Sequence, residues 1–209
     1  MLPPRPLLDP ARRFDQAGLP SGTSSRATVE GCSIKREIDE QLAPLVGLPL
    51  RDASRVVDMA TFWFGRLLTR QSRQGPIEVA EYRLHIQETW RITRDGRVLL
   101  GYGDWHYPPR GSTVSYDDFI EKDERHNRQD DLREDWTAHG EEAHTVASAE
   151  GSETGDLAIR FVDGCLLDTF VNQATEGDHG DDEFWRLLPP ESVHLDGPHF
   201  VVTARGTRS

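Results

Sequence analysis

Residues Glu81–Tyr102, EYRLHIQETWRITRDGRVLLGY, alternate between polar and apolar side chains, and this pattern decides the fold. The apolar side chains share the even positions: Tyr82, Leu84, Ile86, Trp90 and Ile92. A period of two is typical of a β-strand that rests one face on a core and leaves the other in solvent. The stretch therefore predicts a half-buried strand, with His85 on its exposed face.

The same stretch contains a reversal of chain direction. Thr93–Gly96 ends in an Asp-Gly pair, which suits a two-residue hairpin turn because both positions tolerate positive φ. A second run of strand type, Val98–Tyr102, follows the turn. We therefore expect an antiparallel sheet with one face on a core.

Further runs of strand type recur along the chain. They lie at Val56–Leu68, Thr145–Ala149, Leu157–Val162, Cys165–Val171, Phe184–Leu188 and His199–Ala204. Periodicity alone leaves a helix open for Val56–Leu68. Helical patterns occur at Ser33–Ala43 and Arg128–Ala138, and Arg51–Ser54 predicts a turn. The sum is an α+β class, mainly antiparallel β-sheet, with about seven or eight strands, two or three short helices and a barrel as one possible form.

Composition divides the chain into a tail and one domain. Met1–Gly31 is rich in proline and serine and has too few apolar residues to offset the entropy of ordering, so we expect a flexible tail. Cys32–Ser209 has the length of a single domain. Within it, residues 104–142 form an acidic excursion, since Asp117–Glu142 holds eleven acidic residues against four basic ones.

The net charge of −12 over 209 residues bears on the choice of partner. It argues against nucleic-acid binding, because phosphate backbones select Lys and Arg, and it favours attraction to a basic protein. The sequence shows neither a run of roughly 20 apolar residues nor the apolar centre of a signal peptide, so we expect a soluble cytoplasmic protein. Cys32 and Cys165 match no metal or redox spacing, and whether they pair stays open.

Six side chains near the end of the hairpin form the candidate binding site: Glu88, Trp90, Asp104, Trp105, His106 and Tyr107. Glu88 interrupts the apolar row, where a carboxylate is costly unless it is paired, lines a cavity or lies in a β-bulge. In Asp104–Tyr107, an Asp and a His can act as an acid–base pair, and the aromatic rings can form pocket walls. The alternative is a structural corner, in which the rings cover the end of the sheet.

Other motifs give no defined chemistry. His139 and His144 are five residues apart, whereas a zinc-protease helix needs histidines four apart, so we expect both to lie exposed in a charged loop. The acidic loop Glu176–Glu183 lacks the spacing of an EF-hand. The sequence contains no nucleophile elbow, P-loop or complete dinucleotide fingerprint. We therefore assign no catalytic residue, no metal ligand and no cofactor.

A set of short segments spans most of Leu45–Thr203: Leu45–Leu50, Phe62–Gly65, Tyr82–Gln87 with Trp90-Arg91, Tyr107–Pro109, Phe184–Leu188 and Pro198–Thr203. Together these segments resemble a family of small, soluble, mostly actinobacterial proteins that are uncharacterised and carry no established activity. The resemblance leaves the N-terminal tail outside. It implies a grouping and no reaction, ligand or partner.

Two functions fit these observations. The first is a non-enzymatic binding protein whose acidic segments, Asp117–Glu142 and Glu176–Glu183, face a basic protein; its charge and size are similar to those of immunity proteins that neutralise toxins. The alternative is a small-molecule-binding protein or hydrolase with a pocket at the end of the Glu81–Tyr102 hairpin. The two differ in whether Glu88 and His106 converge on one cavity. The oligomeric state does not follow from the sequence.

Overall fold

The computed structural model describes residues 33–57, 59–72, 75–122, 126–138, 144–172, 183–192, 199–203 and 206–209. Contacts divide the chain into two units, Met1–Gly31 and Cys32–Ser209. The expected tail lies outside the described residues, as do Cys32, His139 and all of the loop Glu176–Glu183 except its last residue.

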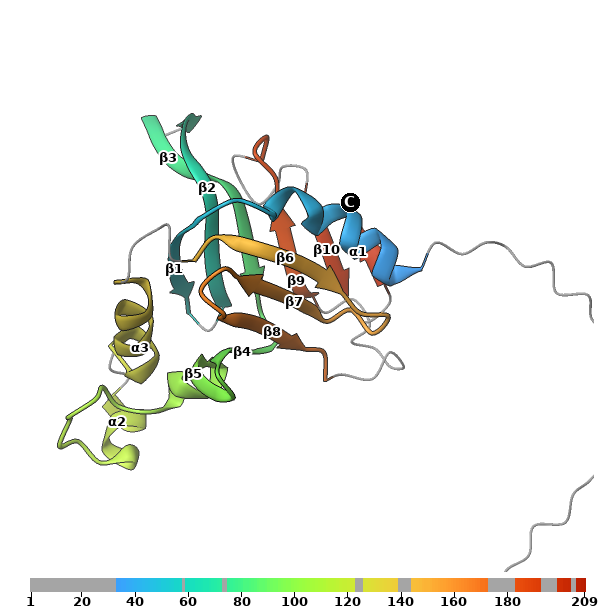
Figure 1. Ribbon diagram of the computed structural model, residues 1–209. Coiled ribbons are helices and arrows are strands. Elements are labelled where there is room, and N and C mark those ends of the chain that lie inside the picture. The colour runs from blue at the N-terminus through green and yellow to red at the C-terminus, as the bar shows by residue number, and fades with distance from the viewer. Residues whose placement is uncertain are drawn as a thin grey trace, which may run out of the picture. The chain divides into compact units, whose positions relative to one another are not determined.

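The larger sheet has six described strands in the spatial order β1-β2-β3-β9-β10-β11 (Figure 1). Their bounds are β1 Leu50–Val56, β2 Met59–Ser72, β3 Gly75–Ile86, β9 Glu183–Leu188, β10 Phe200–Thr203 and β11 Gly206–Arg208. Each strand runs antiparallel to its neighbours. β2 and β3 form a long hairpin through the middle of this sheet.

The smaller sheet has five described strands in the order β5-β4-β8-β7-β6, again antiparallel throughout. Their bounds are β4 Thr89–Arg94, β5 Arg97–Gly101, β6 Val146–Gly151, β7 Leu157–Phe161 and β8 Leu166–Phe170. The prediction of a mainly antiparallel sheet is confirmed. The described strands number eleven rather than seven or eight, and they form two sheets rather than one closed barrel.

Three α-helices accompany the sheets in the described part of the chain. They are α1 Ile34–Leu42, α2 Tyr116–Lys122 and α3 Arg128–Thr137, with the short 3₁₀ helices η1 Ala43–Leu45 and η2 Tyr102–His106. The α+β class is therefore confirmed. A search of these helices for one long and apolar enough to cross a membrane finds none.

The alternating stretch Glu81–Tyr102 is not one continuous strand before its turn, because β3 and β4 belong to different sheets. The chain crosses between the sheets at Gln87 and Glu88. Their backbone N–H groups lie 2.9 and 3.3 Å from the carbonyl oxygen of Phe184. Because the crossing takes two residues, the apolar side chains occupy even positions both before and after it. They therefore face the core in both sheets. Glu88 interrupts the apolar row because it lies at this bend.

The predicted hairpin turn after β4 is confirmed. Asp95 and Gly96 adopt positive φ angles of 52° and 73° between β4 and β5. Positive φ at both central residues is the conformation of a type I′ turn, which matches the twist of the strands that it joins. The Asp-Gly pair thus sets the register of this hairpin.

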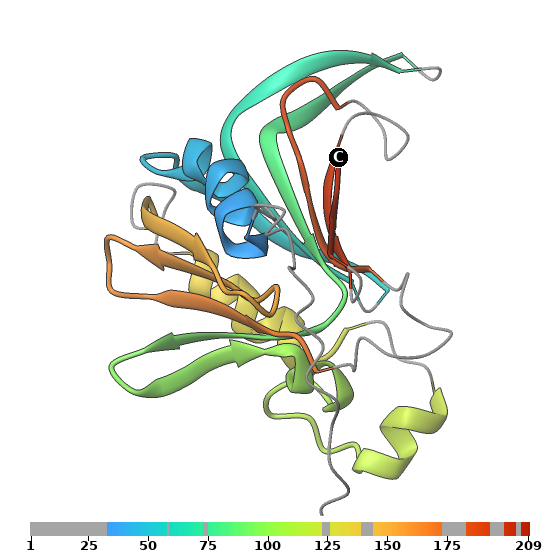
Figure 2. The same ribbon diagram turned by 90° about the vertical axis from the view of Figure 1, so that its right-hand side faces the viewer.

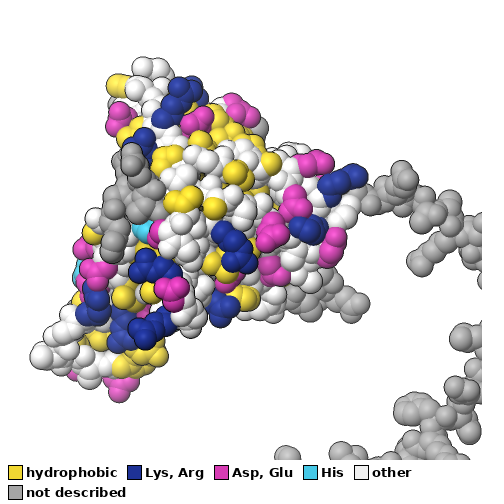
Figure 3. All heavy atoms as spheres, in the orientation of Figure 1, with side chains coloured by type: hydrophobic (Ala, Val, Ile, Leu, Met, Phe, Trp, Pro, Cys, Tyr) yellow, Lys and Arg dark blue, Asp and Glu magenta, His cyan; other side chains and the backbone are white. Residues whose placement is uncertain are grey.

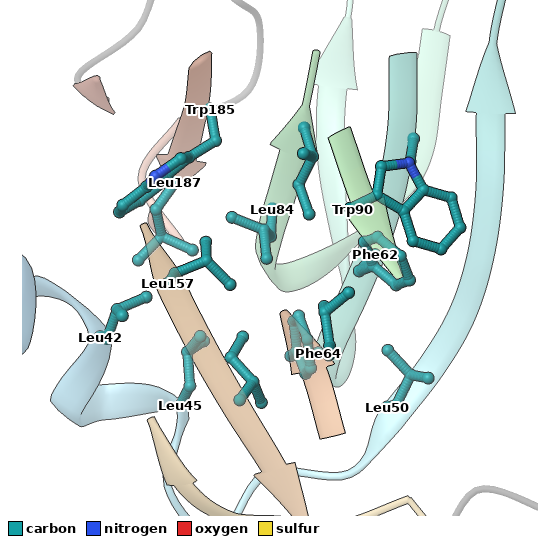
Figure 4. Close-up of a cluster of buried hydrophobic side chains, with 14 of the residues drawn as sticks. Leu42, Leu45, Leu50, Phe62, Phe64, Leu84, Trp90, Leu157, Trp185 and Leu187 are labelled. Atoms are coloured by element: carbon teal, nitrogen blue, oxygen red, sulfur yellow. The ribbon is translucent and has the colours of Figure 1, made fainter. Parts of the chain in front are cut away.

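The core lies between the two sheets, and Figure 4 shows Phe62, Phe64 and Leu84 of the larger sheet near Leu157 of the smaller one. Trp90 meets Phe62 edge-on, with ring centroids 5.4 Å apart. The side chains in the figure are buried, and each contributes about 1.5–3 kcal/mol to stability by its removal from water. This apolar layer holds the sheets together.

Two helices cover edge strands of the sheets. α1 packs against β6 and β11, one edge strand of each sheet, and α3 packs against β5 and β1, the opposite edge strands (Figure 2). α1 buries Ile38 and Leu42. It approaches β6 so closely that a Cβ atom on Gly151 would lie 2.3 Å from Cγ2 of Ile38. The helices thereby shield edges that would otherwise offer unpaired backbone groups.

Two local expectations are wrong. Arg51–Ser54 is part of β1 rather than a turn; β1 is an edge strand, and polar side chains are common there. His85 is only 8 % exposed. It lies on β3 between Thr61 of β2 and Arg186 of β9, and flanking side chains cover a residue in the middle of a sheet even on its outer face.

Candidate functional site

Between β5 and β6 the chain leaves the smaller sheet and forms η2, α2 and α3. We call residues 102–138 the inserted segment; they contain most of the expected excursion 104–142. Figure 1 shows α2 and α3 at one end of the molecule, on the far side of the sheets from α1. This segment carries four of the six predicted site residues.

A buried ion pair attaches the inserted segment to the larger sheet. Arg55 of β1 donates from Nη2 and Nε to the two carboxylate oxygens of Asp130 on α3, at 3.0 and 3.1 Å. The two side chains are 16 % and 9 % exposed. Burial would raise the pKa of Asp130, but the hydrogen bonds from Arg55 and from the Asn127 N–H outweigh it and hold this pKa below its ordinary value of 3.8.

The same carboxylate also begins α3. Asn127 accepts a hydrogen bond from the Asp130 N–H at 3.2 Å, and Asp130 accepts one from the Asn127 N–H at 3.1 Å. This reciprocal pair is a capping box, which satisfies N–H groups that the first helical turn leaves free. Asp130 therefore couples the start of the helix to its attachment at Arg55.

Three further contacts hold α3 in place. Gln129 donates to the carbonyl oxygen of Gly101 at 3.2 Å, and Arg133 donates to that of Ala53 at 3.0 Å. Trp136 is buried against Phe161, with ring centroids 5.7 Å apart. The segment is thus held by polar contacts together with apolar ones, since Tyr102 and Leu132 also pack against the core that contains Trp136.

The structure places Trp90 in the core and Glu88 at the bend between the sheets. Trp90 is 4 % exposed and packs on Phe62, so its ring forms part of the core rather than a pocket wall. Glu88 is half-buried. The register of β4 with β5 places the start of β4 beside η2, at one end of the hairpin.

The four residues of Asp104–Tyr107 point in different directions. Asp104 turns back and accepts a hydrogen bond from the Gly101 N–H at 3.0 Å. Trp105 lies under the guanidinium group of Arg55, whose Cζ is 3.9 Å from the ring centroid. His106 and Tyr107 are exposed. Asp104 and Trp105 therefore support the attachment of η2, which is the structural corner given above as the alternative.

Several hollows in the described surface lie away from these residues. Three of them, of about 320, 270 and 200 Å³, are lined by residues outside the set of six. The first is formed by the ends of β6, β7 and β8, the second by α1 and the C-terminus, and the third by α3, β4 and β5. None of these three hollows is lined by the six predicted residues, so the hollows do not support a single ligand pocket formed by that set.

The outer side of the inserted segment carries a pair of tyrosines. The rings of Tyr107 and Tyr116 lie 5.8 Å apart and are 45 % and 50 % exposed. Arg128 places its guanidinium group 4.6 Å from the Tyr107 ring, and its N–H donates to the Tyr107 carbonyl oxygen. The exposed carboxylates Asp117 and Asp118 follow Tyr116 on α2. We call Tyr107, Tyr116, Asp117 and Asp118 the tyrosine face.

Part of the expected acidic surface is neutralised within the segment. Asp131 accepts a hydrogen bond from the Arg110 N–H at 2.5 Å and lies 2.8 Å from Nε2 of His126. The first of these contacts contributes most to holding the pKa of Asp131 below 3.8. Asp135 pairs with the Arg110 side chain. Figure 3 likewise shows acidic and basic side chains interspersed on one face, so part of the acidic charge is paired with basic side chains.

One histidine differs from expectation. His144 is 2 % exposed rather than solvent-exposed, and its ring lies 4.5 Å from that of Trp136. Its Nε2 lies 2.8 Å from the carbonyl oxygen of Trp136. This burial could not be predicted from local sequence, because the partners of His144 are brought to it by tertiary packing.

Sequence reasoning missed Arg55, Tyr116 and Asp130. Asp130 was counted only as one charge in an acidic run, although Asn127 three residues earlier is a capping signal that points to a structural role. Arg55 lies 75 residues from its partner, and only the fold brings the two together. No protein family, curated protein or solved structure matches this chain. The resemblance to the actinobacterial family therefore stays a prediction.

Proposed function

We propose that this protein is a non-enzymatic binding protein that presents the tyrosine face to a basic protein. The observation that carries the proposal is the exposed pair Tyr107 and Tyr116, with rings 5.8 Å apart, next to Asp117 and Asp118. Tyrosine is enriched at protein interfaces because its ring buries a large apolar area and its hydroxyl keeps a polar contact. Exposed side chains of this kind on an inserted segment favour binding over a role in the core.

The charge of the chain supports a basic partner. The net charge is −12, and Asp117 and Asp118 stand exposed beside the tyrosines. Carboxylates around an aromatic centre attract basic surfaces, speed the encounter and repel acidic competitors. Arg128 against Tyr107 also presents the aromatic ring in a fixed position. A basic toxin neutralised by an immunity-type protein is one partner of this chemistry.

The alternative, small-molecule binding or hydrolysis at the end of the hairpin, has less support. Trp90 lies in the core, Asp104 is hydrogen-bonded to backbone, and Trp105 is stacked on Arg55. A catalytic site needs its groups within reach of one reacting atom. The contacts of these residues instead attach η2 to the sheets.

The test is affinity purification with the full chain from its native cells, followed by measurement of the dissociation constant of the complex at low and high salt. We expect a partner with a basic surface, bound more weakly as salt rises. Tyr116→Ala should raise the dissociation constant at least about tenfold, which corresponds to about 1.4 kcal/mol and is typical of a central interface residue. Asp117→Asn should raise it several-fold at low salt and less at high salt.

Matched controls lie away from the tyrosine face. Val162→Ala removes an exposed apolar side chain between β7 and β8, and Glu78→Gln removes an exposed carboxylate on β3. Both should leave the dissociation constant unchanged. An acidic partner, or a partner that binds Tyr116→Ala as tightly as the natural chain, would contradict the proposal.

A further inference from the structure

Three side chains that can ligate a metal meet beneath α3. Nδ1 of His144, a carboxylate oxygen of Asp163 and Sγ of Cys165 all lie within 4.8 Å of one another. His144 precedes β6, whereas Asp163 and Cys165 flank the turn between β7 and β8. His144 and Cys165 are buried, and Cys165 carries a free thiol. The topology thus brings together residues 19 and 21 positions apart in the sequence.

The imidazole of His144 is held in one tautomer. Its Nε2 lies 2.8 Å from the carbonyl oxygen of Trp136, and a carbonyl only accepts, so Nε2 carries the proton. In the neutral ring, Nδ1 then carries a lone pair and no proton. It lies 2.9 Å from Oδ2 of Asp163 without the alignment of a hydrogen bond. Two lone pairs this close repel each other unless a proton or a metal ion lies between them.

The thiol completes the arrangement. Cys165 donates from Sγ to the same Oδ2 of Asp163 at 3.1 Å, and its N–H donates to Oδ1 at 3.0 Å. A catalytic Cys-His pair would need the thiol to face the imidazole, whereas here both groups contact one carboxylate oxygen. Burial also raises the pKa of the thiol to about 11, which is the opposite of an activated nucleophile.

We propose that His144 Nδ1, Asp163 Oδ2 and Cys165 Sγ form a binding site for Zn²⁺. Nitrogen, oxygen and sulfur are the donors that Zn²⁺ takes, and tetrahedral coordination holds its ligand atoms about 3.5 Å apart. The Nδ1–Oδ2 and Sγ–Oδ2 distances are each about 0.5 Å shorter than this, so small side-chain rotations suffice. Nε2–H donation to a backbone carbonyl is the usual support for a histidine that binds metal through its other nitrogen.

Binding keeps the charges in balance. Zn²⁺ displaces the thiol proton to solvent and is held by a thiolate, a carboxylate and a neutral imidazole. Three protein ligands leave a fourth position for water. His144 also lines the hollow of about 200 Å³ between α3 and the β4–β5 hairpin, which offers solvent a route to the cluster.

Arg94 competes with the metal. Its Nη1 lies 3.9 Å from Oδ2 of Asp163, and its side chain is 41 % exposed in the β4–β5 hairpin. A fixed positive charge at this distance opposes a second cation. Removing it should therefore tighten Zn²⁺ binding, an effect that a purely structural role of the cluster does not predict.

The test is a Zn²⁺ titration of the metal-free full chain against a chromophoric chelator, with Co²⁺ as a spectroscopic substitute. We expect one Zn²⁺ to bind at this cluster and the Co²⁺ complex to show a thiolate charge-transfer band. Cys165→Ala and His144→Ala should each weaken the binding more than about 100-fold, beyond the 10- to 100-fold loss typical of outer-shell changes. Arg94→Ala should strengthen it several-fold.

His106→Ala is the matched control, since it removes an exposed histidine distant from the cluster in sequence. It should leave the Zn²⁺ affinity unchanged. Cys165→Ala decides the test if His144→Ala fails to fold, because it removes a single sulfur atom. Absence of bound Zn²⁺, an affinity that Cys165→Ala leaves unchanged, or a Co²⁺ spectrum without the thiolate band would overturn the proposal.

Discussion

The two-sheet body and the inserted segment are held by different forces. Between the sheets, large apolar side chains such as Phe64, Leu84 and Trp185 are fully buried. In the segment of residues 102–138, the Arg55–Asp130 pair and side chain–backbone hydrogen bonds add to the apolar contacts that Trp136, Tyr102 and Leu132 make with the core. Apolar burial does not depend on the charge state of any group, whereas an ion pair depends on the protonation of its partners. We therefore expect the segment to loosen while the sheets remain folded.

Removal of a core ring should have the largest effect on the sheets. Phe64 on β2 is fully buried, so Phe64→Ala leaves a cavity as well as losing apolar burial. We expect the free energy of unfolding of the sheets to fall by about 3–5 kcal/mol. Chemical denaturation followed by fluorescence and circular dichroism measures this. A loss of less than about 1 kcal/mol would contradict a tightly packed core at Phe64.

Arg55→Ala should act on the segment instead. It leaves the buried carboxylate of Asp130 without its main partner, and we expect a loss of about 3 kcal/mol, at the lower end for a broken buried pair because both side chains keep some exposure. Faster amide exchange confined to residues 102–138 would locate the effect. The control is Arg66→Ala. Arg66 is 74 % exposed and its Nε lies 3.7 Å from a carboxylate oxygen of Glu81, which makes a weak surface ion pair, so its loss should change the free energy of unfolding by less than about 0.5 kcal/mol.

Acid should weaken the sheets before it affects the Arg55–Asp130 attachment. Burial and the nearby Arg186 and Arg83 lower the pKa of His85 from 6.5 to about 4. Between pH 6.5 and pH 4 the unfolded chain binds a proton at this histidine that the folded chain does not. The free energy of unfolding therefore keeps its full value above pH 6.5 and falls by about 3 kcal/mol by pH 4. The lowered pKa of Asp130 acts in the same direction, but only below about pH 4.

Denaturation of His85→Gln across this range separates the two effects. The variant cannot take up the proton, so it should lose the pH dependence between 6.5 and 4 and keep the loss at lower pH. An unchanged slope in the variant would show that His85 is not the group responsible.

Substitution of one glycine by alanine in each region compares how tightly the two regions are packed. A Cβ on Gly151 would lie 2.3 Å from Ile38, so Gly151→Ala must displace α1, at a cost of about 1–3 kcal/mol. A Cβ on Gly103 in η2 would have open space around it. Gly103→Ala should therefore change the melting temperature little, and equal losses in both variants would contradict the difference in packing.

The sequence predicted much of the fold because its strands follow local patterns. The alternation in Glu81–Tyr102, the Asp95-Gly96 turn and the helix at α3 all depend on neighbouring residues. The break between β3 and β4 escaped notice because two residues at the bend preserve the parity of the apolar row. Glu88 was the one visible sign of it.

The site was harder to predict, because it depends on contacts between distant parts of the chain. The hairpin brings η2 beside the start of β4. Yet the direction of each side chain is decided by partners such as Arg55, which stacks on Trp105, and these lie far away in sequence. The burial of His144 beside Asp163 has the same origin.

Native-state hydrogen exchange of the unmodified chain tests the central difference most directly. At increasing, subdenaturing concentrations of denaturant, the amides of α2 and α3 should exchange through an opening of lower free energy than the amides of β3 and β8. The two sets should converge only near global unfolding. Identical opening free energies for the helices and the central strands at every denaturant concentration would contradict the account.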